Sequence, residues 1–391
     1  DKNCYEAFAE KGKNMFWKGA GTWVLLTALL VSAFYSAISG WICGYLIEAI
    51  AGRIQALQTS DLATTHFKDL LKNPLWGLGY HFIFLGTSLA LVYAGLRKGI
   101  ERGCKILMPI LFFTLLVLVI KGLTLDNASK TLEYLFNPDW SLITPSVVLM
   151  ALGQAFFTLS VGQGTMITYG SYLSKNTPFV RSCIAVALAV IVVSILAAIA
   201  VFSITFSANI IPEGGLGLMF QTLPVVFSHM AGGNILAVIF FLLVALAALT
   251  SEISVLEPLI AYLVDNHRWS RKKAALTTGL MAFVIGIPCA LSTSLLSNWT
   301  LWGKNILELF DLTATTILVP IGGLLGVLLV SWRWGFAHAF KELSNGHTKQ
   351  YPIGYQYLKI CLKYLAPAVI LILYKIPLPN QKAAKTEQLL R

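Results

Sequence analysis

Two short polar sequences interrupt segments that are otherwise apolar enough for a lipid bilayer. The first is Ser160-Val-Gly-Gln-Gly164, in the middle of the stretch 145–172. Glycine in a helix interior costs about 1 kcal/mol relative to alanine, so two glycines this close favour a break in the helix. A break at mid-membrane frees backbone N–H and C=O groups, which lipid tolerates only where they face protein or a polar cavity. Broken helices form binding sites in transporters; a glycine-rich packing surface or a mild kink is the simpler alternative.

The second polar sequence is Thr250-Ser251-Glu252, near the centre of the apolar stretch 234–264. Hard cations prefer hydroxyl and carbonyl oxygens, so a Thr-Ser pair facing a broken helix suits a Na⁺ site. The structural alternative is that both hydroxyls bond to carbonyls of the preceding turn. Glu252 is harder to explain by packing, because a carboxyl group at that depth needs a partner, a proton or water.

The elements that must position these residues are membrane-spanning helices. The chain has 391 residues, of which 57% are hydrophobic and 12% charged, whereas soluble proteins carry about 25% charged residues. About 20 apolar residues suffice to cross a bilayer. We predict an all-α polytopic membrane protein with about nine transmembrane helices, at 20–50, 74–96, 106–123, 145–172, 179–206, 234–264, 274–295, 306–331 and 355–374.

The remaining segments predict a single transmembrane domain over residues 1–391. We expect 1–19 to be a cytoplasmic segment, 51–73 a polar loop, 145–172 an unwound site helix and 208–232 an extracellular hairpin of two short helices. With an internal N-terminus, the inner loops hold 19 of the 29 lysines and arginines and the outer side 10, which agrees with the positive-inside rule.

The sequence argues against several other classes of function. The net charge of +11 is distributed over short loops, whereas nucleic-acid binding gathers basic residues on one polar face. No catalytic motif of the zinc-protease, serine-hydrolase or phosphate-binding type is present, and the six cysteines show no paired spacing. We therefore expect no enzyme and no nucleic-acid partner, but a protein of the lipid bilayer that handles a small molecule.

Several segments resemble the bacterial branch of the neurotransmitter:sodium symporter family, in order and spacing along nearly the whole chain. They are Ser36–Trp41 after Phe34-Tyr35, Lys98–Pro109, Ala151–Ser160, Ile167–Tyr172, Phe220–Pro224, Ala248–Ser251 and Ala366–Pro367. The resemblance implies the leucine-transporter fold, an inverted repeat of five helices plus five with one further helix in bacterial members. The nine predicted spans then correspond to the family's third to eleventh helices, so the family's first two helices are missing. We expect that these 391 residues alone do not transport.

The resemblance also implies roles for individual residues. Its substrate-contacting positions fall on Val31, Tyr35, Phe157, Ser160, Gln163, Ser251 and Val255. Its sodium ligands fall on Thr158, on the Ala247 carbonyl, and on Thr250 and Ser251. Asp311 resembles the acid of the outer gate, and Gln154 the polar residue beneath it.

Three positions depart from the family pattern. Val190 stands where the family places an oxygen ligand of its first sodium site, which leaves the number of Na⁺ ions open. Ser194 falls where chloride-dependent members carry a serine and others a carboxylate, so Cl⁻ is open as a further cofactor beside Na⁺. Gln163 replaces a residue that is often aromatic; its amide could bond a polar substrate side chain or satisfy freed backbone groups.

The resemblance therefore implies sodium-coupled symport of a neutral amino acid by alternating access in the cell (inner) membrane, with aromatic and hydrophobic side chains as candidates. One alternative keeps the fold and couples transport to protons through Glu252. Another is a non-transporting truncated remnant or a regulatory binding protein. A homodimer is one assembly that the sequence leaves open.

Overall fold

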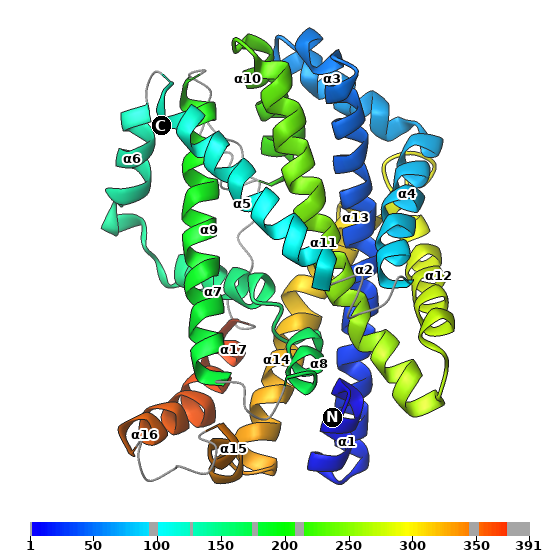
Figure 1. Ribbon diagram of the computed structural model, residues 1–391, viewed down its shortest axis with the longest axis vertical. Coiled ribbons are helices and arrows are strands. Elements are labelled where there is room, and N and C mark those ends of the chain that lie inside the picture. Colours follow the sequence, from blue (N-terminus) through cyan, green and yellow to red (C-terminus); the bar gives the residue numbers. More distant parts are fainter. Residues whose placement is uncertain are drawn as a thin grey trace.

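The computed structural model describes residues 2–93, 101–125, 128–173, 179–207, 215–343 and 352–373. Its long helices form a bundle, and most of them run roughly along the longest axis of the molecule (Figure 1). These are α2 (Met15–Ile50), α4 (Pro74–Tyr93), α5 (Glu101–Leu123), α9 (Phe179–Ser207), α11 (Gly233–His267) and α12 (Arg271–Ala290). A further helical stretch runs through α13 (Ile306–Leu312), η5 (Thr313–Leu318), α14 (Val319–Leu328) and η6 (Leu329–Arg333). The last consists of α16 (Pro352–Ile360), η8 (Cys361–Leu365) and α17 (Ala366–Leu373).

Seven of these helical stretches are long and apolar enough to cross a bilayer, counted over the described residues. They coincide with seven of the nine predicted spans. The third predicted span lies in α5, which forms a bent pair of 111° with α6 (Ala128–Phe136) and would be an eighth candidate. The fourth is the broken stretch of α7 (Pro145–Thr158) and α8 (Thr165–Ser171). The prediction of an all-α polytopic membrane protein is therefore confirmed.

Short elements gather at the two ends of the bundle. Figure 1 shows α3 (Ser60–Lys72) and α10 (Leu223–His229) at one end, and α1 (Cys4–Gly12), α15 (Phe336–Leu343) and α16 at the other. The remaining short elements are η1 (Arg53–Ala56), η3 (Trp140–Leu142), η4 (Leu218–Thr222) and a two-stranded antiparallel ribbon of β1 (Thr300–Leu301) and β2 (Lys304–Asn305).

The prediction of a polar loop over 51–73 was wrong, because α3 occupies most of it. Thr59 caps this helix by accepting a hydrogen bond from the Leu62 N–H, as a side-chain cap does at a helix N-terminus. Ala63 and Phe67 are its buried residues. Their spacing of four residues places both on one face of the helix, and the polar residues on its other faces gave the segment the composition of a loop.

The predicted hairpin at 208–232 is described from residue 215 onward, and residues 208–214 lie outside the described ranges. There η4 leads directly into α10, so this part is one continuous helical stretch. Phe220 anchors it, because its fully buried ring stacks on Phe67 at 5.1 Å and lies 4.9 Å from the ring of Tyr45. The Tyr45 hydroxyl also donates to the Phe220 carbonyl at 3.0 Å.

Candidate functional site

The break between α7 and α8 has the backbone conformation that its sequence predicts. Ser160, Gly162 and Gly164 all have positive φ, at 53°, 94° and 81°. Left-handed backbone is readily adopted by glycine and costs other residues of order 1 kcal/mol or more. The two glycines therefore allow the chain to leave one helix and begin the next within six residues.

Gly162 brings the break into direct contact with α14. A Cβ atom at Gly162 would lie 2.0 Å from the Val319 carbonyl oxygen, and one at Gly322 would lie 2.0 Å from the Gly162 carbonyl oxygen. Only glycine permits backbones to approach this closely. The break is thus held against α14 by backbone contact.

Gln163 and Gly164 lie on the buried side of the break. A Cβ atom at Gly164 would lie 2.9 Å from Cys4 Sγ and 2.9 Å from Val24 Cγ1. Gln163 is 3% exposed, and its Oε1 has no hydrogen-bond partner among the described residues. Buried polar atoms usually have a partner, so this oxygen is free to accept a bond from a bound molecule.

Hydrogen bonds connect α8 to the hydroxyl-rich part of α11. The Tyr169 hydroxyl donates to Ser254 Oγ at 2.8 Å, and Thr165 Oγ1 donates to the Ser254 carbonyl at 3.3 Å. Ser254 Oγ donates in turn to the Thr250 carbonyl at 3.0 Å. The start of α8 is therefore fixed to the turn of α11 that carries the predicted sodium ligands.

The predicted sodium ligands are partly brought together. Thr250 Oγ1 donates to the Ala247 carbonyl at 2.9 Å, so two of the predicted ligand oxygens are adjacent. This is the bond to the preceding turn that a purely structural role requires, but a hydroxyl that donates its proton keeps lone pairs for a cation. Thr158 and Ser251 are both exposed. Thr158 Oγ1 accepts a bond from Gln154 Nε2 at 3.4 Å, and no hydrogen bond joins it to Thr250 among the described residues.

Four of the seven predicted substrate residues share one hydrophobic cluster. Val31 and Val255 are buried within it, and Tyr35 and Phe157 pack against it from partly exposed positions. The Tyr35 hydroxyl also lies close to the side chain of Ser251. Helices α2, α7 and α11 therefore contribute apolar and hydroxyl groups to one region. Ser160 lies at the break itself, in its left-handed conformation.

The two predicted gate residues have no hydrogen bond or ion pair with each other in the described chain. Asp311 is exposed on α13, and its carbonyl accepts a bond from Thr315 Oγ1 at 2.7 Å. Gln154 is exposed on α7. Their role as a gate stays a prediction.

Sequence reasoning missed a polar cluster beneath the break. Glu257, which is fully buried on α11, accepts from the Tyr172 hydroxyl at 2.6 Å and from two guanidinium nitrogens of Arg271 at 3.1 and 2.6 Å. A carboxylate in an apolar helix was the available signal, because a buried charge needs a partner. The partners lie 85 and 14 residues away in the sequence, and Arg271 read only as a charge in an inner loop.

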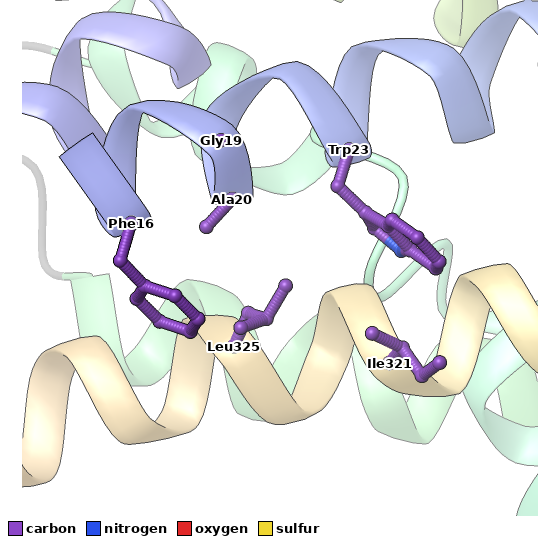
Figure 2. Close-up of a pocket in the computed structure, with 6 residues that line it drawn as sticks. All are labelled: Phe16, Gly19, Ala20, Trp23, Ile321 and Leu325. Carbon is purple, nitrogen blue, oxygen red and sulfur yellow. The ribbon is translucent and has the colours of Figure 1, made fainter.

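An apolar groove between α2 and α14 is a different feature from this site. It has a volume of about 490 Å³. Figure 2 shows the side chains that line it, from Phe16, Gly19, Ala20 and Trp23 on one helix and Ile321 and Leu325 on the other. All six residues are apolar, so the groove has no side chain to hold the charged groups of an amino acid. The predicted site residues do not line it.

Comparison with known proteins decides the family. A sequence model described as the sodium:neurotransmitter symporter family matches residues 76–389. The chain belongs to the sodium:neurotransmitter symporter family. The uncharacterized sodium-dependent transporter YhdH of Bacillus subtilis is 33% identical, with 95% of this chain and 82% of the relative covered. An uncharacterized sodium-dependent transporter of Haemophilus influenzae is also 33% identical, with 95% and 83% covered.

A solved structure of the same fold extends the comparison. The crystal structure of MhsT in complex with L-phenylalanine matches with a TM-score of 0.86 and 36% identity, covering 95% of this chain and 84% of that one. The resemblance to the sodium:neurotransmitter symporters and their leucine-transporter fold is therefore confirmed. The chain is a multi-pass transporter of the cell (inner) membrane from a sodium-dependent family, and not an enzyme.

Proposed function

We propose that this protein couples inward Na⁺ flow to the uptake of a neutral amino acid with an aromatic or hydrophobic side chain, by alternating access. The observation that carries the proposal is the break at 159–164, because the helix that follows it, α8, is hydrogen-bonded to Ser254, one turn along α11 from Thr250 and Ser251. Freed backbone groups next to hydroxyl oxygens suit an amino acid's charged groups and a hard cation.

The surroundings of the break support an apolar side chain in the substrate. Val31 and Val255 are buried, and Tyr35 and Phe157 pack on the same cluster. MhsT, of the same family, is solved with L-phenylalanine. The unpartnered Oε1 of Gln163 adds one acceptor, which would favour a substrate whose ring carries a donor, such as an indole N–H or a tyrosine hydroxyl.

Uptake measurements on the full-length protein test the proposal. Radiolabelled L-phenylalanine should accumulate in proteoliposomes under an inward Na⁺ gradient and should not accumulate when choline replaces Na⁺. Accumulation driven by a proton gradient without Na⁺ would favour the alternative in which Glu252 serves proton coupling. Absence of uptake for every neutral amino acid in either gradient would favour a binding protein or a remnant.

Substitutions on α11 test the sodium ligands. Thr250→Val and Ser251→Ala should each raise the Na⁺ concentration for half-maximal uptake. Thr87→Val is a matched control, because Thr87 also donates to a carbonyl of its own helix, that of Ile83 at 2.8 Å, but lies exposed on α4. An unchanged Na⁺ requirement in Thr250→Val would contradict the assignment.

Chloride dependence is a separate part of the proposal. It rests on Ser194, which is exposed on α9, and on its correspondence to the serine of chloride-dependent members. Replacing chloride by gluconate at constant Na⁺ should lower uptake if Ser194 serves this role, and Ser194→Glu should then restore it.

A further inference from the structure

Glu252 is a buried carboxyl group, and the one hydrogen bond it makes within the described part of the chain links two helices of the site. It has no exposed surface, and the Ser32 hydroxyl of α2 donates to its Oε1. Its Oε2 is buried without a hydrogen-bond partner, and no ion pair to Glu252 occurs in the described chain. Burying a polar group that is incompletely bonded is unfavourable, so packing alone would be better served by an apolar side chain.

The bond joins the two helix turns that carry the proposed ligands. On α2, Ser32 follows Val31 and precedes Tyr35 by one turn. On α11, Glu252 directly follows Thr250 and Ser251. The Tyr35 hydroxyl also lies close to the side chain of Ser251. The Ser32–Glu252 bond, with the approach of Tyr35 to Ser251 one turn further along α2, therefore constrains the axial position and the rotation of α2 relative to α11, because residues three apart lie on one helix face.

We propose that Glu252 is a positioning residue that couples Na⁺ binding to substrate binding by holding α11 to α2 through Ser32. The inference rests on the proposed function. A cation bound by Thr250 and Ser251 fixes the turn of α11 that also carries Glu252. Because Glu252 is bonded to Ser32, the cation also fixes the turn of α2 that carries Tyr35. Coupling of this kind is reciprocal, so substrate would raise the affinity for Na⁺ by the factor by which Na⁺ raises the affinity for substrate.

The chain offers a matched control one turn further along α2. Ser36 is fully buried, like Ser32. Its hydroxyl contacts the Ser32 carbonyl at 2.6 Å and His81 Nε2 of α4 at 3.0 Å. No hydrogen bond joins Ser36 to α11 among the described residues. Removing either serine hydroxyl deletes a buried hydrogen bond, but only Ser32→Ala breaks the bond between the two ligand-bearing helices.

The experiment measures the coupling factor, which is the ratio of the substrate dissociation constants without and with Na⁺. Radiolabelled L-phenylalanine is the probe, in full-length purified protein, with choline replacing Na⁺ at constant ionic strength. Allosteric coupling typically amounts to about 5–150-fold. We expect Ser32→Ala and Glu252→Leu to lower the wild-type factor at least ~5-fold, and Ser36→Ala to leave it within ~2-fold at a similar loss of thermal stability.

Glu252→Gln separates position from charge. Glutamine keeps an acceptor oxygen for Ser32, so a positioning role predicts a coupling factor within ~2-fold of wild type. The double variant Ser32→Ala/Glu252→Leu should lose no more coupling than either single variant, because both remove one interaction. If Glu252→Leu does not fold, Ser32→Ala and Glu252→Gln still test the positioning role of Glu252.

Each outcome bears on a distinct claim. Wild-type coupling in Ser32→Ala, or a loss in Ser36→Ala equal to that in Ser32→Ala, would overturn the positioning role while leaving the transporter assignment intact. A loss in Glu252→Gln as large as in Glu252→Leu would overturn it in favour of a role for the charge. Wild-type protein that binds L-phenylalanine without any Na⁺ dependence would remove the proposed function, and the inference with it.

Discussion

The guanidinium group of Arg271 holds both carboxylate oxygens of Glu257, at 3.1 and 2.6 Å, although Glu257 itself has no exposed surface. Bidentate pairing of this type fixes geometry as well as charge. It joins the start of α12 to the C-terminal half of α11, and the Tyr172 hydroxyl adds α8 to the same carboxylate at 2.6 Å. Three elements therefore depend on one pair.

Arg271→Leu should destabilise the protein strongly, because it leaves a buried carboxylate unpaired. Removing one partner of a buried ion pair costs about 3–5 kcal/mol, whereas Tyr172→Phe removes one hydrogen bond and should cost about 1–3 kcal/mol. Thermal unfolding in detergent measures both. Lys272→Ala is the control, because the ammonium group of this exposed neighbour lies over the Tyr93 ring at 4.7 Å. This substitution should lower the free energy of unfolding by no more than about 1 kcal/mol. Equal losses for Arg271→Leu and Lys272→Ala would contradict the prediction.

Gly162→Ala should disrupt the break. Its φ of 94° strains any other residue, and the new Cβ would meet the Val319 carbonyl oxygen at 2.0 Å. Strained backbone alone costs about 1–3 kcal/mol. Gly153→Ala, one helix segment earlier in α7, meets nothing within 4 Å and should stabilise the helix by about 1 kcal/mol. The melting temperature should therefore fall in Gly162→Ala and rise in Gly153→Ala. A change of the same sign in both variants would contradict the close contact of Gly162 with the Val319 carbonyl.

Phe220→Ala should release the helical stretch of η4 and α10 from the bundle. The ring is fully buried and contacts Phe67 and Tyr45, and such a truncation costs about 3–5 kcal/mol. Limited proteolysis within 215–232 should accelerate, since local opening becomes easier. Leu216→Ala, at a position 36% exposed, is the control. Tyr45→Phe, which loses only the bond to the Phe220 carbonyl, should give an intermediate rate.

Cys4 should resist alkylation in the folded protein. Burial raises the pKa of the Cys4 thiol to about 12, and the thiolate is the reactive form. Because the folded-state pKa lies above the unfolded one, this group favours folding fully below pH 9 and ceases to do so as the pH rises toward 12. In a variant with Cys4 as its one cysteine, maleimide labelling at pH 8 should be slow until the protein is unfolded. Fast labelling of folded protein would show that α1 does not cover the break.

The long apolar spans and the break were predictable because each depends on local composition. Apolar length marks a membrane helix, and Gly162 and Gly164 mark a place where a helix cannot continue. The helix α3 was not predicted because only Ala63 and Phe67 of its residues are buried. The average composition of the segment is therefore polar, as in a loop. His81 was regarded only as one of several dispersed histidines. Its full burial on α4 was not predicted, because its partner Ser36 lies on a different helix.

The pairings within the site were the least predictable part. Which oxygen of α11 faces which hydroxyl of α2 depends on the rotation of two helices, and hydrophobicity alone hardly varies with that rotation in a bundle surrounded by lipid. Glu252 was noticed as a group needing a partner, but Ser32 could not be selected from the many serines of the spans. The resemblance supplied residue roles, whereas Glu257, Arg271 and Tyr172 came only from the structure.

The backbone contact between Gly162 and Gly322 has a consequence for sequence variation. In most packed contacts, enlarging one side chain can be offset by shrinking its neighbour. Here the obstacle to a side chain at either position is a carbonyl oxygen, of Val319 in one case and of Gly162 in the other. No substitution removes a carbonyl oxygen, so neither change can be compensated by the other. Both positions should stay glycine independently in functional homologues, without the paired replacements by which contacts are usually detected in alignments.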